Sequence, residues 1–152
     1  MFKILFVCHG NICRSPMAEF IMKKIVKEKG EEESFYIESA ATSREEFGNG
    51  VYPPVKRILN AMGIDCSNKR ARQVTYSDYD KFDYIVCMDQ NNMRNIKRII
   101  PNDSKNKIFT LLSLTDTPRD VADPWYTGDF DTTKEDVLKG CNALYDYVKN
   151  AR

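Results

Sequence analysis

A short segment near the N-terminus places a cysteine, a glycine, an asparagine and an arginine in an order that suits phosphate chemistry. It reads Cys8-His9-Gly10-Asn11-Ile12-Cys13-Arg14-Ser15-Pro16. Cys8 is the candidate nucleophile. Arg14, six residues later, carries a planar guanidinium that can hold two phosphate oxygens at once, which a lysine cannot do. The segment therefore predicts a cysteine thiolate beside an anion site.

The residues around this segment predict a strand that leads directly into a helix. Residues 2–7 have the length and the β-branched and aromatic content of a buried strand. Ser15 is a suitable N-cap and Pro16 a suitable first helical residue. Unpaired N–H groups and the helix dipole favour an anion at such a terminus, and Gly10 and Asn11 tolerate the left-handed backbone that turns amides inward. We expect the loop to bind a phosphate-sized dianion and to stabilise the thiolate.

The rest of the chain alternates strand patterns with helix patterns. Strands are expected at 35–39, 84–88 and 107–111, and helices at 53–62, 89–100 and 133–149. This alternation predicts a three-layer α/β fold, in which helices cover both faces of a parallel sheet. Ligands bind such sheets at the carboxyl ends of the strands, and Cys8 stands at one of these ends.

Length and charge restrict the possible classes of protein. With 152 residues, 42% of them hydrophobic, and no linker-like stretch, residues 1–152 are expected to form a single domain. The 23 basic and 22 acidic residues nearly balance, which gives no drive toward nucleic acid or an acidic membrane. Basic clusters at 69–72 and 94–98 are interpreted as solvated faces.

Cysteine and histidine usage argues against a disulfide framework and against zinc. Five cysteines are an odd number, which favours a reducing compartment. No Cys-x2-Cys pair is present and His9 is the only histidine, so we expect no metal site. The N-terminal apolar run is too short for a membrane span, and polar residues from His9 onward interrupt any signal-peptide core. A cytoplasmic location is the resulting expectation.

Transfer of the phosphoryl group of an aryl phosphate ester to Cys8 would also need a proton donor for the departing oxygen. The segment before the last helix is rich in aspartates that could serve. Asp123 is the preferred candidate, because Pro124 restricts it to an extended backbone that projects the carboxyl group. Trp125 and Tyr126 follow and are expected to form one wall of a pocket that stacks on a phenyl ring. The other candidates are Asp116, Asp120, Asp129 and Asp131.

The segment from Val7 to Glu19 resembles the signature of the low-molecular-weight protein tyrosine phosphatases. Three later stretches are similar to that family as well: residues 38–43, residues 82–89 and Asp123-Pro124-Trp125-Tyr126. The resemblance implies four parallel strands in the order 2-1-3-4, with the phosphate-binding loop after the first. It also implies hydrolysis of phosphotyrosine in proteins, with inorganic phosphate and other oxyanions as inhibitors and no cofactor.

Each residue of the motif then has an expected role in that reaction. Cys8 attacks phosphorus to form a cysteinyl-phosphate, Arg14 clamps the phosphate, and Asp123 serves as general acid and then as general base. Ser15 donates a hydrogen bond to the departing sulfur or serves only as an N-cap. The backbone of His9, Gly10, Asn11, Ile12 and Cys13 forms the loop, and the side chain of Asn11 maintains its shape.

Four positions depart from the family pattern and bear on substrate preference. His9 replaces a small apolar residue, and Glu45 stands where an aromatic wall residue is common. Val55 replaces an aspartate, and Lys69 replaces a histidine that often supports the loop asparagine.

Three alternatives remain on the sequence alone. A protein arginine phosphatase of the same fold is disfavoured because Ile12 stands where a threonine is typical. An arsenate reductase would need two further cysteines close together, whereas Cys66, Cys87 and Cys141 are widely spaced. A non-enzymatic phosphate-binding module would not need Asp123.

Overall fold

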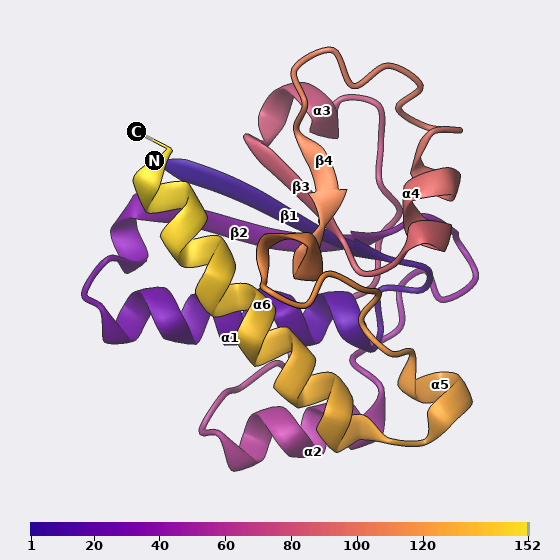
Figure 1. Ribbon diagram of the computed structural model, residues 1–152. Coiled ribbons are helices and arrows are strands. Elements are labelled where there is room, and N and C mark those ends of the chain that lie inside the picture. Colours follow the sequence, from indigo (N-terminus) through magenta and orange to yellow (C-terminus); the bar gives the residue numbers. More distant parts are fainter. Residues whose placement is uncertain (152) are drawn as a thin grey trace.

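The computed structural model describes residues 1–151 and contains one four-stranded parallel sheet (Figure 1). Its order, β2-β1-β3-β4, confirms the order expected from the family resemblance. The pairing aligns Cys8 with Ala41 on one side of β1 and Val7 with Cys87 on the other. The strands are β1 (Phe2–Cys8), β2 (Phe35–Ala41), β3 (Tyr84–Cys87) and β4 (Ile108–Thr110).

Helices cover both faces of the sheet, which confirms the three-layer prediction (Figure 1). Buried side chains of α1, α2 and α6 form the core on one face, and those of α3 and α4 contribute to the core on the other. The helices are α1 (Arg14–Glu28), α2 (Pro53–Ala61), α3 (Asp78–Lys81), α4 (Gln90–Ile96), α5 (Pro124–Thr127) and α6 (Phe130–Asn150), with 3-10 turns η1 (Glu32–Ser34) and η2 (Leu111–Leu114).

Residues 4–7 of strand β1 are all apolar because both faces of the strand are covered there. Ile4 and Phe6 pack on the side of α1 and α6, whereas Leu5 and Val7 pack on the side of α3 and α4. All four side chains are fully buried. Successive side chains of a strand point to opposite faces, so a central strand between two layers needs apolar residues at every position.

Helix α6 packs close to the turn that follows β4. Its buried side chains recur at helical spacing, and Gly140 allows the close approach. A Cβ atom at Gly140 would lie 2.3 Å from Cγ of Leu111. The final helix is therefore fixed against the same layer that contains α1, whose N-terminus carries the candidate site.

Several element boundaries differ from the sequence predictions. Helix α1 begins at Arg14 with Cys13 in the cap position, so the N-cap role predicted for Ser15 was wrong. Helix α4 ends at Ile96 and not at residue 100. Helix α6 begins at residue 130, three residues early, because the carboxylate of Asp129 accepts a hydrogen bond from the amide of Thr132. Within residues 1–151, no helix combines the length and the apolar content needed to cross a membrane.

Candidate active site

The loop between β1 and α1 turns around the sulfur of Cys8. Asn11 has a positive φ of 61°, whereas Gly10 does not, so the left-handed residue of the loop is the asparagine. The amide of Asn11 donates to Cys8 Sγ at 3.3 Å, and Ser15 Oγ lies 3.0 Å from the same sulfur. Cys8 is 4% exposed, so these two contacts act on a largely desolvated sulfur.

Arg14 is buried and held in place by acceptors from two distant loops. Its Nη1 lies 2.8 Å from Oδ2 of Asp89 and donates to the carbonyl oxygen of Val121 at 2.9 Å. Burial by itself lowers the pKa of Arg14. The nearby Cys8 and the carboxylates of Asp89 and Asp123 have the larger combined effect, so the pKa is raised overall. Among residues 1–151 no acceptor contacts Nε, so the edge formed by Nε and Nη2 is the one that can face a phosphate.

Asp123 approaches Arg14 from the segment before α5. Its Oδ2 lies 3.5 Å from Nη2 of Arg14, and its Oδ1 accepts a hydrogen bond from the amide of Trp125 at 3.0 Å. The backbone at Asp123 is extended, with φ −86° and ψ 109°, as the following Pro124 predicts. The carboxyl group therefore also caps α5, and its side chain is 29% exposed.

Both polar atoms of the Asn11 side chain form hydrogen bonds, within the loop and beyond it. Its Nδ2 donates to Ser15 Oγ at 2.8 Å and to Ser39 Oγ at 2.9 Å, while its Oδ1 accepts from the amide of Arg72 at 3.2 Å. Asn11 is 1% exposed. The loop is thus tied to β2 and to the segment before α3, as well as to its own helix.

A cavity of about 450 Å³ opens above this loop. Its lining includes His9, Glu45 and Glu46 together with the exposed rings of Trp125 and Tyr126. His9 Nε2 lies 2.9 Å from Oε2 of Glu45, at the solvent-exposed rim. The remaining residues that line the cavity are Cys8, Gly10, Ile12, Cys13, Arg14, Asp89, Asn91, Asn92, Asn95 and Asp123.

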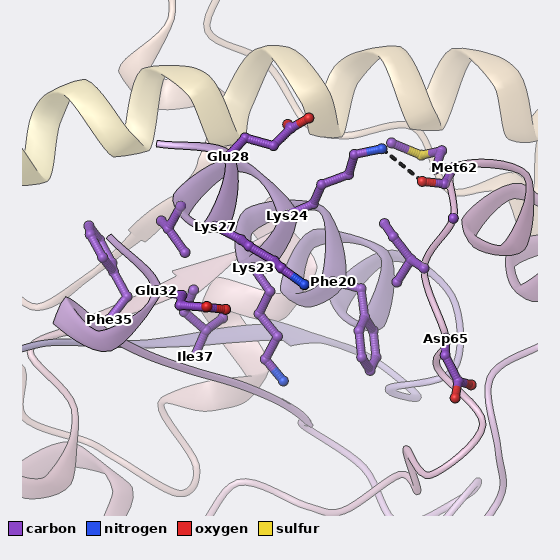
Figure 2. A pocket seen from close by; sticks show the side chains of 13 residues that line it. Phe20, Lys23, Lys24, Lys27, Glu28, Glu32, Phe35, Ile37, Met62 and Asp65 are labelled. Atoms are coloured by element: carbon purple, nitrogen blue, oxygen red, sulfur yellow. Dashed lines mark hydrogen bonds between the residues drawn. The ribbon is translucent and has the colours of Figure 1, made fainter. Parts of the chain in front are cut away.

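A second cavity, of about 780 Å³, lies away from the loop between α1, the start of β2 and the end of α2 (Figure 2). Lys24 donates there to the carbonyl oxygen of Met62 at 2.7 Å, and Lys23 and Lys27 share the rim with Glu28 and Asp65. Neither cysteine nor histidine lines this cavity. Of these two cavities, only the one above Cys8 is lined by cysteine and histidine side chains.

The comparisons with known proteins agree with this geometry. A family model described as "Low molecular weight phosphotyrosine protein phosphatase" matches residues 3–152. The chain belongs to this family. A Gallus gallus protein of the same description is 43% identical to it over 94% of this chain and 93% of the relative.

Solved structures extend the comparison of this phosphatase. The crystal structure of YfkJ from Bacillus subtilis superposes with a TM-score of 0.95 at 35% identity, covering 100% of this chain and 97% of that one. A structure described as drosophila arginine phosphatase superposes with a TM-score of 0.87 at 27% identity, covering 97% and 98% of the two chains.

The contact of Asp89 with Arg14 in the phosphatase site was not predicted from the sequence. From the sequence, Asp89 is only the first residue of the helix expected over 89–100, and its Oδ1 does cap α4 by accepting from the amide of Asn92 at 2.7 Å. Its other oxygen holds Arg14. The available signal was its position just after β3, at the carboxyl edge of the sheet where ligands bind.

The basic cluster at 69–72 is a solvated face only in part: Arg70 is exposed as predicted, whereas Lys69 and Arg72 are partly buried. The side chain of Lys69 is 11% exposed, and its Nζ donates to the carbonyl oxygen of Ser39 at 2.8 Å. Arg72 forms two hydrogen bonds with the carboxylate of Asp78.

Within the described residues no group of three or more His, Cys, Asp or Glu side chains is arranged to hold a metal ion.

The second cysteine of the loop, Cys13, is buried close to the charged groups of the site. Burial, together with the nearby Cys8 and Asp123, raises the pKa of Cys13 to about 12. Cys13 therefore stays a thiol at neutral pH. We predict that Cys13, which lines the same cavity as Cys8, acts as a resolving group. Mild peroxide should first oxidise Cys8 to a sulfenic acid, and Cys13 should then form a disulfide with it as water is released. The raised pKa of Cys13 should make this second step slow, because the thiol must lose its proton in order to attack.

Mass spectrometry after peroxide, with and without thiol rescue, checks this prediction. The expected product is a Cys8–Cys13 crosslink that thiol reduces, whereas the Cys13→Ser variant should progress to irreversible sulfinic acid at Cys8. The idea fails if the crosslink is absent, or if Cys13→Ser recovers as fully as the unmodified protein.

Proposed function

We propose that the chain hydrolyses phosphotyrosine in proteins, as a single domain over 1–152 and without a cofactor, through a cysteinyl-phosphate at Cys8. The observation that supports this proposal is the convergence of Cys8, Arg14 and Asp123 on one cavity, with Arg14 contacting the carboxylate of Asp123 at 3.5 Å. A phosphate-binding module would need the loop and Arg14, but it would have no use for a carboxyl group at that position.

In the first step the Cys8 thiolate attacks phosphorus in line with the tyrosine oxygen. The loop amides and the Nε/Nη2 edge of Arg14 stabilise the equatorial oxygens as charge develops on them. Protonated Asp123 delivers its proton to the tyrosine oxygen as the P–O bond breaks. The S–P bond replaces the P–O bond, and tyrosine leaves as the neutral phenol.

In the second step Asp123, now ionised, removes a proton from a water molecule that attacks the cysteinyl-phosphate. The S–P bond breaks and the electron pair returns to Cys8 as a thiolate. Ser15 Oγ, 3.0 Å from the sulfur, and the amide of Asn11 donate hydrogen bonds that stabilise this leaving group. Inorganic phosphate is the product, and it and other oxyanions are expected to compete with substrate for the loop.

The walls of the cavity support an aromatic substrate. Trp125 packs on Tyr52, with ring centroids 5.2 Å apart, yet it is 60% exposed and lines the cavity with Tyr126. A phenyl ring placed between these aromatic residues and the segment of Glu45 would be held while its phosphate reaches Cys8. The shorter phosphoserine side chain would not span the same depth.

Phosphate release from three peptides of one sequence tests the proposal. The peptides carry phosphotyrosine, phosphoserine or phosphoarginine, and release is measured with the purified protein. We expect the phosphotyrosine peptide to be hydrolysed fastest. The phosphoarginine peptide is included because one structural neighbour is described as an arginine phosphatase, although apolar Ile12 offers no hydroxyl to a guanidino phosphate. Faster release from phosphoarginine would reassign the substrate, and binding without release from any peptide would leave only a phosphate-binding module.

The rim of the cavity leads to a prediction about the residues that flank phosphotyrosine. Glu45 and Glu46 add negative charge beside an anion site, and Cγ of Glu46 lies 3.4 Å from where a Cβ of Gly10 would be. Substrates with basic flanks should therefore have higher kcat/KM than substrates with acidic flanks, and salt should weaken the preference. Matched peptides with Lys or Glu flanks are compared at low and high salt. The double variant Glu45→Gln/Glu46→Gln should lose most of the preference, and an unchanged flank ratio would exclude this role.

A cytoplasmic location completes the proposal. All five cysteines are unpaired and buried, which fits a reducing compartment, and the proposed nucleophile must stay reduced in order to act.

A further inference from the structure

A hydrogen-bonded chain connects a buried ion pair to the sulfur of the nucleophile. Glu19 on α1 and Lys69 lie 3.4 Å apart, with side chains 5% and 11% exposed. Ser39 Oγ donates to Oε1 of Glu19 at 2.5 Å. From Ser39 the contacts continue through Asn11 and Ser15 to Cys8. We refer to this series from Glu19 to Cys8 as the sulfur-directed chain.

Two groups determine which atom donates in each hydrogen bond of the sulfur-directed chain: the carboxylate of Glu19 and the backbone amide of Arg72. An ionised carboxylate only accepts, so the proton of Ser39 is committed to Glu19. Ser39 Oγ must then accept from Asn11, whose orientation is fixed because Oδ1 accepts from the amide of Arg72. The second N–H of that amide group is directed to Ser15 Oγ.

Ser15 Oγ accepts from Asn11, so its own proton is free to be donated to Cys8 Sγ, 3.0 Å away. A hydroxyl that already accepts a hydrogen bond is a stronger donor, since neighbouring hydrogen bonds polarise one another. The resulting O–H to sulfur bond favours the thiolate over the thiol, because only the thiolate gains a charge-assisted bond.

We propose that Lys69 is a positioning residue for Cys8, because it holds the carboxylate of Glu19 and the backbone of Ser39 at the far end of the sulfur-directed chain. The proposal rests on the proposed function of Cys8 as nucleophile. A carboxylate that is 5% exposed is stabilised by a cation inside the protein, and Nζ of Lys69 approaches Oε1, the same oxygen that accepts from Ser39. Lys69 thereby holds that oxygen where the Ser39 hydroxyl can donate to it. Lys69 also fixes the backbone of Ser39 directly, through its bond to the carbonyl oxygen.

Lys23 supplies a matched control on the same carboxylate. Its Nζ lies 2.6 Å from Oε2 of Glu19, but its side chain is 44% exposed, so solvent screens its contribution. Oε2 is also not the oxygen that accepts from Ser39. Removing Lys23 should therefore leave the sulfur-directed chain intact, although the distance from Lys23 to Glu19 is the shorter of the two.

The test measures alkylation of Cys8 by iodoacetamide as a function of pH, followed on the Cys8 peptide by mass spectrometry. This readout needs no substrate, so it is independent of whether the protein hydrolyses phosphotyrosine. In Lys69→Met we expect the midpoint of the pH profile to move upward by about half a unit to one unit, as for the loss of one charge-assisted hydrogen bond. Lys69→Arg should restore most of the profile, and Lys23→Met should not move it.

The route through Ser39 is tested by a double-mutant cycle. Ser39→Ala removes the hydroxyl that connects Glu19 with Asn11, so by itself it should move the midpoint upward as well. In the Ser39→Ala background Lys69→Met should add little. This single variant also keeps the proposal testable if Lys69→Met does not fold, because an unchanged midpoint in folded Ser39→Ala overturns it.

Two other results would contradict the proposal. A folded Lys69→Met protein with an unchanged midpoint would make the ion pair purely structural. An equal shift in both backgrounds would mean that Lys69 acts on Cys8 through its electric field and not through the sulfur-directed chain.

Discussion

Replacing Cys8 with serine is expected to abolish hydrolysis of aryl phosphates while leaving phosphate binding in place. Serine has no thiolate at neutral pH, so neither attack on phosphorus nor a cysteinyl intermediate is available. The loop amides and Arg14 remain, however, and the variant should still bind a phosphotyrosine peptide. Hydrolysis is measured by phenol release and binding by calorimetry.

Arg14→Lys is the companion variant, and its expected loss of kcat is about 10²–10³. A lysine keeps the charge, but it cannot present two parallel N–H groups to the transition state. It also cannot contact Asp89 and Val121 at the same time as substrate, as the guanidinium can. Activity of the unmodified protein should persist in chelator. Loss of activity in chelator, or a Cys8→Ser variant that keeps most of its activity, would contradict the covalent mechanism.

The second large effect is expected at Asp123, and it should depend on the leaving group. Asp123→Ala should lower kcat by ~10²–10⁴ for phenols that leave poorly, because they need a proton as the P–O bond breaks. An activated phenol leaves without that proton and should lose much less. The measurement is kcat for a series of aryl phosphates of increasing phenol acidity, compared between the variant and the unmodified protein.

Two nearby aspartates are the controls for that series. Asp129 caps α6, where it accepts from the amide of Thr132, and Asp131 lies in the first turn of the same helix. Asp129→Ala and Asp131→Ala should change kcat equally for all leaving groups, if at all. Should either of them show the leaving-group dependence in place of Asp123→Ala, the role of general acid would move to that residue.

The sequence could indicate that Cys8, Arg14 and Asp123 belong to one site, and all three line one cavity, because their signals are local. Cys8 and Arg14 stand within one loop whose strand and helix neighbours are recognisable, and Pro124 imposes on Asp123 an extended backbone that can be read directly. The order of the strands came from the family resemblance, since alternation alone predicts a parallel sheet but not the arrangement within it.

The supporting residues could not be predicted, because their partners are distant in sequence. Lys69 belongs to a run of charges that usually faces solvent, and only the folded chain places it against Glu19 and Ser39. At Lys69 a long-range contact therefore overrides the local preference. Ser15 is an exception: its hydroxyl lies 3.0 Å from the sulfur of Cys8, within the same loop, and the sequence already offered this contact as one of two roles for Ser15.

The long separations of these contacts have a consequence for biosynthesis. Arg14 donates to a carbonyl group 107 residues further along the chain, and the amide that holds Asn11 is 61 residues away. A ribosome therefore exposes the signature segment long before the residues that give it its shape have been made. We expect a nascent or truncated chain that ends before Val121 to contain the nucleophile without a formed anion cradle. The contact that holds Arg14 can thus form only after Val121 has been made, so we expect a shorter chain to lack phosphatase activity.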